Sequence, residues 1–345
     1  MELCTFLICD PTEEAAVLEV TTPAEWSLRL IDDPSERFWF GPNYMQTIQR
    51  PSALRPDLSE LKRGRLAVVK CSSRDEGENA ADLLRACCDI IDSDPTHQVY
   101  SKSSIQLPDQ PEHYPALFKT RGFFEQFAHF SDLPVALRLT TNCWADRSIA
   151  YAAHKLLLSY RFDRVTWWSM HPKHGQKFSK TSALHRDHVG TAFAVNAAFS
   201  AIEELGLEVR SSAKLKRFDD NDLPAWNPKV LLDIQDRLLQ AGIDPNEDFE
   251  WVQRGAPSDA ESGLKPRFRL PSPYADGDVV RDLRIKITDA IHYCSVLRNF
   301  MTAHRFADAT SSIGPYEVYN VQSVARRLIL GRGECWPVES GKGSP

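Results

Sequence analysis

Several features that would assign a protein to a class are missing from this sequence of 345 residues. No apolar run approaches the roughly 18 residues needed to cross a bilayer. No basic stretch precedes the apolar start of the chain, as a secretory signal would require. The eight cysteines are irregularly spaced and include no Cys-x-x-Cys pair, which argues against both a disulfide framework and a zinc ribbon. We therefore expect a soluble protein of the reducing cytoplasm, with no membrane partner.

The short motifs of several enzyme classes are also missing. The sequence has no P-loop, no Gly-x-Gly-x-x-Gly after a strand, no Gly-x-Ser-x-Gly elbow and no His-Glu-x-x-His. A nucleotide-driven activity and a serine-hydrolase activity therefore have no support in the sequence, and we expect no cofactor.

Charge is distributed unevenly along the chain. The net charge of −6 divides into −8 for residues 1–140 (22 acidic against 14 basic) and +2 for residues 141–345 (25 acidic against 27 basic). The second part also carries seven of the ten histidines. Because an acidic surface repels phosphate, any contact with nucleic acid is expected in the C-terminal part.

Residues 1–140 have the pattern of a mixed α/β domain. Short runs rich in β-branched and aromatic residues, separated by turn residues, predict strands at Thr5–Cys9, Ala16–Thr21, Trp26–Ile31, Arg37–Phe40 and Leu66–Cys71. One helix is expected at Asn79–Ile91, and loops around Pro51–Pro56 and Pro108–Pro115. This part shows no catalytic constellation, and a sensing, regulatory or partner-docking role remains open for it.

From about residue 141 the pattern changes to helices. Apolar stripes with capping residues predict helices at Asp146–Tyr160, His185–Leu205, Asn227–Ala241, Thr288–His304 and Tyr316–Leu330. Helices of this kind predict an all-α bundle over residues 141–333, followed by a flexible tail at 334–345. The fold class expected for the whole chain is α+β.

The helix expected at Thr288–His304 carries the most suggestive residues. Thr288 is a candidate N-cap, and apolar residues at helical spacing give the helix a core-facing stripe. Away from that stripe stand Arg298, Asn299 and His304. A guanidinium binds phosphate with forked donors, an imidazole exchanges a proton near pH 7, and an amide can orient both. These residue types can bind a phosphate and exchange a proton beside it.

An arginine, a polar residue and a histidine in this order resemble the Arg-x(4–6)-His signature of HEPN-domain ribonucleases. The resemblance covers about residues 146–331 and implies an endoribonuclease that attacks phosphate with the ribose 2′-hydroxyl. It also implies that Arg298 binds the phosphate, His304 is the general acid/base, and Asn299 orients them. Positions 298 and 304 lie about 120° apart on an ideal helix. In the family, two copies of the helix face each other in a homodimer and build a composite site. Such proteins often act as toxins or in antiphage defence.

Two other interpretations remain open. The helical part could be a non-catalytic module that binds RNA or a regulatory protein partner. Weaker nucleic-acid contacts are candidates at Lys173, Lys177, Lys180, Arg186, Arg326 and Arg327. Alternatively, a metal-dependent enzyme could use a zinc site, for which the candidate ligands are His171, His174, His185 and His188.

Overall fold

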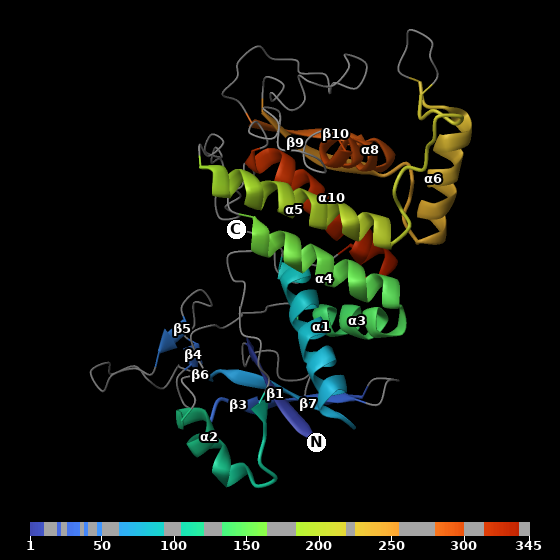
Figure 1. Ribbon diagram of the computed structural model, residues 1–345. Coiled ribbons are helices and arrows are strands. Elements are labelled where there is room, and N and C mark those ends of the chain that lie inside the picture. Colours follow the sequence, from blue (N-terminus) through green and yellow to red (C-terminus); the bar gives the residue numbers. More distant parts are fainter. Residues whose placement is uncertain are drawn as a thin grey trace. The chain divides into compact units, whose positions relative to one another are not determined.

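The computed structural model describes residues 1–9, 19–21, 26–34, 38–40, 47–49, 62–92, 105–120, 133–163, 184–218, 225–254, 280–299 and 314–337. Helices and strands are both present, as an α+β fold requires (Figure 1). The chain divides into two compact units between Ala145 and Asp146. None of the described helices is both long and apolar enough to cross a membrane.

The N-terminal unit is built on an antiparallel sheet of five strands in the order β2-β3-β7-β1-β8. Its strands are β1 (Glu2–Cys9), β2 (Glu19–Thr21), β3 (Ser27–Asp32), β7 (Arg65–Lys70) and β8 (Ile105–Gln106). A second, three-stranded sheet consists of β4 (Phe38–Phe40), β5 (Thr47–Gln49) and β6 (Lys62–Arg63). The five runs predicted as strands from their β-branched and aromatic residues thus correspond to β1, β2, β3, β4 and β7.

Helices also belong to the described part of this unit. They are α1 (Arg74–Asp92), η3 (Pro111–His113), α2 (Tyr114–Thr120) and α3 (Leu133–Ala145). The loop expected around Pro108–Pro115 was therefore wrong in part, because Pro111 begins η3 and Pro115 lies in the first turn of α2, positions where proline's missing N–H costs nothing. The domain boundary expected at residue 140 falls inside α3, which packs against α1.

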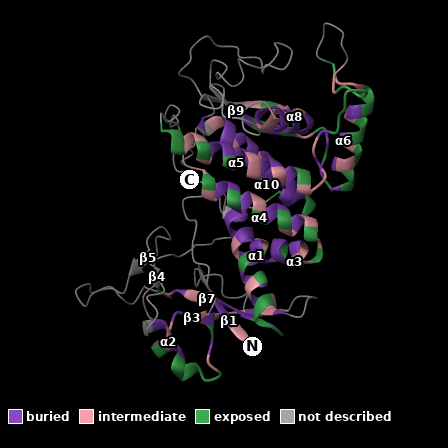
Figure 2. Cartoon of the chain, viewed as in Figure 1, coloured by how far each residue is buried: buried purple, intermediate pink, exposed green. Residues whose placement is uncertain are grey.

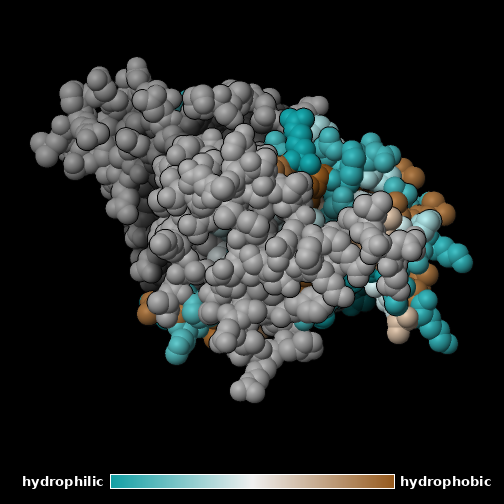
Figure 3. Space-filling view, turned by 90° about the horizontal axis from the view of Figure 1, so that it is seen from above, coloured by the Kyte–Doolittle hydropathy of each residue, from teal (hydrophilic) through white to brown (hydrophobic). Residues whose placement is uncertain are grey.

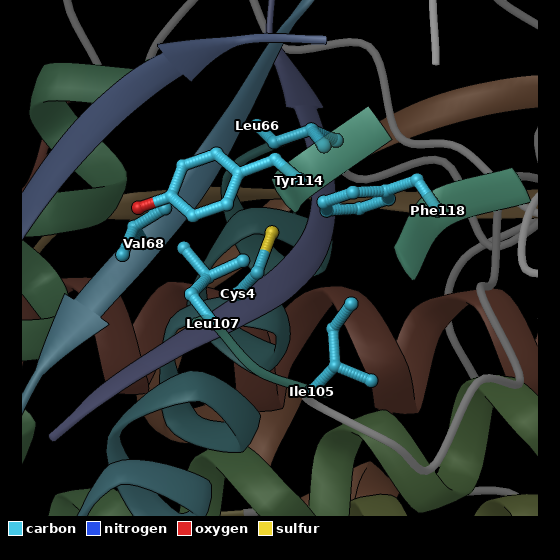
Figure 4. Close-up of a cluster of buried hydrophobic side chains, with 7 residues drawn as sticks. All are labelled: Cys4, Leu66, Val68, Ile105, Leu107, Tyr114 and Phe118. Atoms are coloured by element: carbon cyan, nitrogen blue, oxygen red, sulfur yellow. The ribbon is translucent and has the colours of Figure 1, made fainter. Parts of the chain in front are cut away.

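The central strands of the N-terminal sheet are buried on both faces. On one face, Cys4, Leu66 and Val68 pack against the ring of Tyr114 and the ring of Phe118, one turn further along α2 (Figure 4). On the other face α1 covers β1 and β7. Its Gly77 approaches so closely that an added Cβ would lie 2.5 Å from Leu3 Cδ1. Burial on both faces explains why β7 is an unbroken apolar run, rather than an alternating one.

The C-terminal unit is not all-α, contrary to the expectation from sequence. It contains α4 (Arg147–Phe162), α5 (His185–Glu204), α6 (Pro228–Gln240), α8 (Ile287–Leu297) and α10 (Pro315–Arg332), and also the antiparallel pair β9 (Asp248–Arg254) and β10 (Val280–Lys286). In β9 the buried side chains of Phe249 and Trp251 alternate with the exposed side chain of Glu250. This period of two is a strand signal that the expectation of a helical bundle overlooked.

The caps of the helices explain why their positions follow from local sequence. Asp146 accepts a hydrogen bond from the backbone N–H of Ser148 at the start of α4, and Asn227 does the same for Lys229 at the start of α6. After α5 and α6, Gly206 and Gly242 adopt positive φ angles of 68° and 72°. Glycine enters this conformation without the steric cost of a Cβ, which ends each helix at that point.

Helix α10 is the centre of the C-terminal unit. It contacts α4, α5, α8 and β9 and is largely buried (Figure 2). Its buried polar residues each bond a neighbour. Asn320 exchanges hydrogen bonds of 2.9 and 2.8 Å with the backbone of Val252 in β9, and Gln322 donates to Ser159 of α4 at 3.2 Å. These directional bonds fix the register of α10 against both neighbours.

The chain continues in ordered contact beyond α10. Residues 334–337 were expected to belong to a flexible tail, but Cys335 is buried and its N–H bonds the carbonyl of Leu330 at 2.8 Å. The next side chain, Trp336, lies against the guanidinium of Arg327, 4.4 Å from the ring centroid. Residues 338–345 lie outside the described part of the chain.

Candidate functional site

Helix α8 carries the predicted site, and it begins directly at the end of β10. The expected N-cap, Thr288, is instead a buried residue of the first turn. Lys286 stands at the N-cap position, and the N–H of Ile287 bonds the carbonyl of Glu247 at 3.1 Å. A backbone carbonyl therefore satisfies the helix start where a threonine hydroxyl was expected.

Most of α8 is inaccessible to a substrate. Only Asp289 and Tyr293, of its eleven residues, are not buried. The helix contacts α10 and both strands of the β9–β10 pair. Its C-terminal end is consequently the first place where the predicted residues can meet solvent.

Arg298 and Asn299 lie at that end and are bonded to each other. The Nη1 of Arg298 donates to Oδ1 of Asn299 at 2.7 Å, and both residues are half-buried. The backbone N–H of Arg298 still bonds Cys294 and Ser295, so the pair is anchored to α8. Of the predicted triad, the structure thus brings two members together, while His304 lies outside the described residues.

A polar cluster that the sequence reasoning missed covers the middle of α8. His292 is buried, and its Nδ1 lies 3.1 Å from Nη1 of Arg217. The same arginine donates to the hydroxyl of Ser295. One turn earlier on the helix, Oδ1 of Asp289 accepts from the indole N–H of Trp226 at 2.7 Å. Arg217 and Trp226 thus attach the segment that precedes α6 to the polar side of α8.

The hydrogen bond to Arg217 fixes the state of His292. A guanidinium only donates, so Nδ1 must accept, and the ring is neutral with its proton on Nε2. Burial lowers the pKa of His292 to about 3, and the charge of Arg217 acts in the same direction. The rings of Phe218 and Trp226 lie 4.8 and 5.5 Å from the imidazole. His292 therefore cannot deliver a proton at neutral pH, and it serves to position Arg217 and α8.

Comparisons with models of protein families, with curated proteins and with solved structures each found no match.

The predicted basic residues have different environments. Lys173, Lys177 and Lys180 lie outside the described residues. Arg186 is exposed in the first turn of α5, whereas Arg326 is half-buried on α10. Arg327 is buried, and its guanidinium donates to both carboxylate oxygens of Glu247, from Nε at 2.6 Å. The carboxylate of Glu247 therefore neutralises its charge inside the protein, and we no longer count Arg327 among the candidate contacts to nucleic acid.

Two of the four histidines of the alternative zinc site lie in the described part of the chain. His171 and His174 lie outside the described part. His185 and His188 stand in the first turn of α5, with ring centroids 6.4 Å apart. Within the described ranges, no three side chains of His, Cys, Asp or Glu are grouped so that they could hold a metal ion.

The sequence contains a pattern for the residues of this cluster that lie on α8, but none for their partners. Asp289, His292 and Ser295 recur every three residues, which places them along one side of a helix. Their partners Arg217 and Trp226 are 63 to 78 residues away in the chain, and no local pattern connects them. Sequence alone could mark the polar stripe but could not show that it is covered.

Burial of a neutral His292 predicts a loss of stability in acid. An unfolded histidine takes up a proton near pH 6.5, whereas the folded one resists protonation until about pH 3. Stability is therefore full above pH 6.5 and falls as the pH drops toward 3. We expect a loss of about 2 kcal/mol between pH 7 and 5, measured as the change in free energy of unfolding in urea.

The variant that tests this prediction is His292→Asn, because asparagine keeps an acceptor for Arg217 but does not titrate. It should remove most of the loss between pH 7 and 5, whereas His113→Asn, at an exposed histidine of η3, should leave the loss in place. Burial raises the pKa of Asp289, so its protonation acts in the opposite direction, and this contribution remains in both variants. Equal pH dependence in wild type and His292→Asn would show that His292 does not control it.

Proposed function

We propose that the C-terminal unit is a metal-independent endoribonuclease of HEPN type, with its site at the end of α8. The hydrogen bond between Arg298 and Asn299 is the observation that carries the proposal. It holds a guanidinium in a defined orientation at the point where α8 emerges from the core. A fixed fork of donors suits the charge that develops on a phosphate during cleavage.

The chemistry follows from the residue types. The ribose 2′-hydroxyl loses its proton to a base and attacks the adjacent phosphorus. The bond from phosphorus to the 5′-oxygen breaks, and that oxygen receives a proton. The products are a 2′,3′-cyclic phosphate and a 5′-hydroxyl. Arg298 neutralises the pentacoordinate phosphate, Asn299 positions Arg298, and His304 exchanges the protons as general acid/base.

A second copy of the chain completes the site in this proposal. On an ideal helix positions 298 and 304 would lie about 120° apart, so the proposal places residues of two copies around one phosphate. We propose a homodimer through the helical unit, acting as a toxin or antiphage effector that the N-terminal unit restrains or triggers.

The first test follows the chemistry of wild type. Purified protein with EDTA present should cut a labelled RNA and leave 2′,3′-cyclic phosphate ends, identified by mass spectrometry. The same oligonucleotide with 2′-deoxyribose throughout should stay intact, because it lacks the attacking hydroxyl. A protein that binds RNA without cutting it is the non-catalytic module. Cutting that EDTA abolishes indicates the metal-dependent alternative. Either result overturns the proposal.

A further inference from the structure

Helices α4 and α5 expose an unusual number of large hydrophobic side chains on their outer sides. We call this surface the α4/α5 face and define it by Tyr151, Leu158 and Phe162 of α4 with Leu184, Val189 and Phe193 of α5, all of them exposed. The two helices pack against each other, and α10 contacts both (Figure 1). The α4 members are spaced by seven and four residues, so they follow one side of the helix. The three α4 residues therefore line one side of their helix.

Two aromatic rings meet at the middle of the α4/α5 face. The rings of Phe162 and Phe193 lie 5.4 Å apart with their planes tilted by 34°, although the side chains come from different helices. Phe193 is 51% exposed and Phe162 is 36% exposed. A pair of rings held by two helices offers flat apolar area with little conformational freedom left to lose.

Cations stand at both ends of this face. Arg147 lies one turn before Tyr151, with its guanidinium 5.3 Å from the ring centroid and bonded to the phenol oxygen. Arg186 precedes Phe193 by two turns of α5, and its side chain is 83% exposed. Arg147 and Phe162 are the first and last residues of α4, about 22 Å apart along the helix, so the cations suit an anionic chain that extends along the face.

Acidic side chains on α4 and α5 are few, and two of the three on α5 are paired, whereas the third, Glu203, is exposed. Between its capping residues Asp146 and Asp163, α4 contains no acid. Glu204 of α5 bonds Nζ of Lys155 at 2.6 Å. Asp187 lies 3.5 Å from Nε of Arg186. Apart from the exposed Glu203, the acids of these helices therefore leave the face open to an anionic partner.

We infer that the α4/α5 face binds single-stranded RNA. Unpaired bases stack on Phe162 and Phe193, and phosphates further along the strand, in each direction, contact Arg147 and Arg186. A duplex fits less well, because its bases are stacked on each other and closed to aromatic side chains. This inference rests on the proposed function, since it assigns to the nuclease a surface that presents its substrate.

The test measures binding to a probe that the proposed reaction cannot cut. A fluorescein-labelled 2′-O-methyl oligouridine has no free 2′-hydroxyl and forms no stable structure. Fluorescence anisotropy gives its Kd for wild type and for the double variant Phe162→Ala/Phe193→Ala. We expect the double variant to bind about 10-fold more weakly or worse, and the duplex with oligoadenosine to bind wild type more weakly than the single strand.

Two leucines of α6 provide a matched control, and Arg186 provides a separate test of the phosphate contact. Hydrophobic residues reach the surface elsewhere too, as brown areas among teal in Figure 3 show. Leu232 and Leu239 of α6 are 58% and 60% exposed, so Leu232→Ala/Leu239→Ala removes similar apolar area and should bind as wild type does. Arg186→Gln should reduce the salt dependence of log Kd by about one.

The outcomes separate this inference from the proposed function. Unchanged binding by the phenylalanine variant, or no binding by wild type, overturns the α4/α5 face whether or not RNA is cut. If wild type cuts no RNA but the phenylalanine variant alone loses binding, the α4/α5 face is supported as an RNA-binding surface and the proposed nuclease function is rejected. If the phenylalanine variant turns a dimer into a monomer with unchanged RNA binding, the face is a contact between copies, and the inference fails.

Discussion

Arg298→Ala is expected to lower the rate of RNA cleavage by about 100- to 1,000-fold, because it removes the donor that stabilises charge on the phosphate. His304→Ala is expected to lower it by about 100- to 10,000-fold, the range for loss of a general acid/base. The measurement is single-turnover cleavage of a labelled RNA in EDTA. Asn299→Ala should have a smaller effect, because Arg298 keeps its charge and loses only its orientation.

Two exposed residues provide the matched controls for these losses. Arg284→Ala changes an exposed arginine of β10, and His113→Ala an exposed histidine of η3. Both should cut RNA at the wild-type rate. Gel filtration must show the same size for every variant, because a composite site is also lost when a dimer dissociates. Full activity in Arg298→Ala and His304→Ala would make the motif an ordinary polar end of a packed helix and would remove the proposed site.

Glu247→Ala is expected to destabilise the C-terminal unit by about 3 kcal/mol, because the buried charge of Arg327 loses its carboxylate partner. The carboxylate accepts two hydrogen bonds from that guanidinium, and the side chain of Arg327 is only 5% exposed. The carbonyl of Glu247 also bonds Ile287 at the start of α8, although alanine leaves that bond in place. Urea unfolding followed by circular dichroism at pH 7 gives the change.

An exposed ion pair in the same region provides the comparison. Asp248 and Lys286 lie 2.6 Å apart with both side chains about half exposed, and Asp248→Ala should leave the urea midpoint unchanged. The double change Glu247→Leu/Arg327→Met removes both charges together and should cost much less than the single change. If Glu247→Ala unfolds at the wild-type urea concentration, solvent reaches Arg327 and the pair is not structural.

The parts of the fold that sequence predicted are those fixed by neighbours in the chain. Caps such as Asp146 and Asn227, with glycines after the helices, placed α4, α5 and α6 within two residues of their observed ends. The β9–β10 pair was missed because its two strands are far apart in sequence and only one buries clear alternating residues. Pairing of distant strands depends on tertiary contacts that a local pattern does not contain.

The same distinction between neighbouring and distant residues applies to the candidate site. Arg298 and Asn299 are adjacent residues, so their contact could be expected from sequence, but their place at the end of α8 could not, because the helix was expected to continue to His304. Whether His304 joins them stays a prediction. The cover over α8 could not be expected, because Arg217 reaches His292 across 75 residues. The segment that carries Arg217 covers the middle of α8 and leaves the C-terminal end of the helix as its accessible part.

The central position of α10 also bears on how the chain folds during synthesis. Every element that contacts α10 precedes it in the sequence, so α4, α5, β9 and α8 leave the ribosome before the helix that covers their apolar sides. Until α10 arrives, those sides face solvent and can associate with other chains.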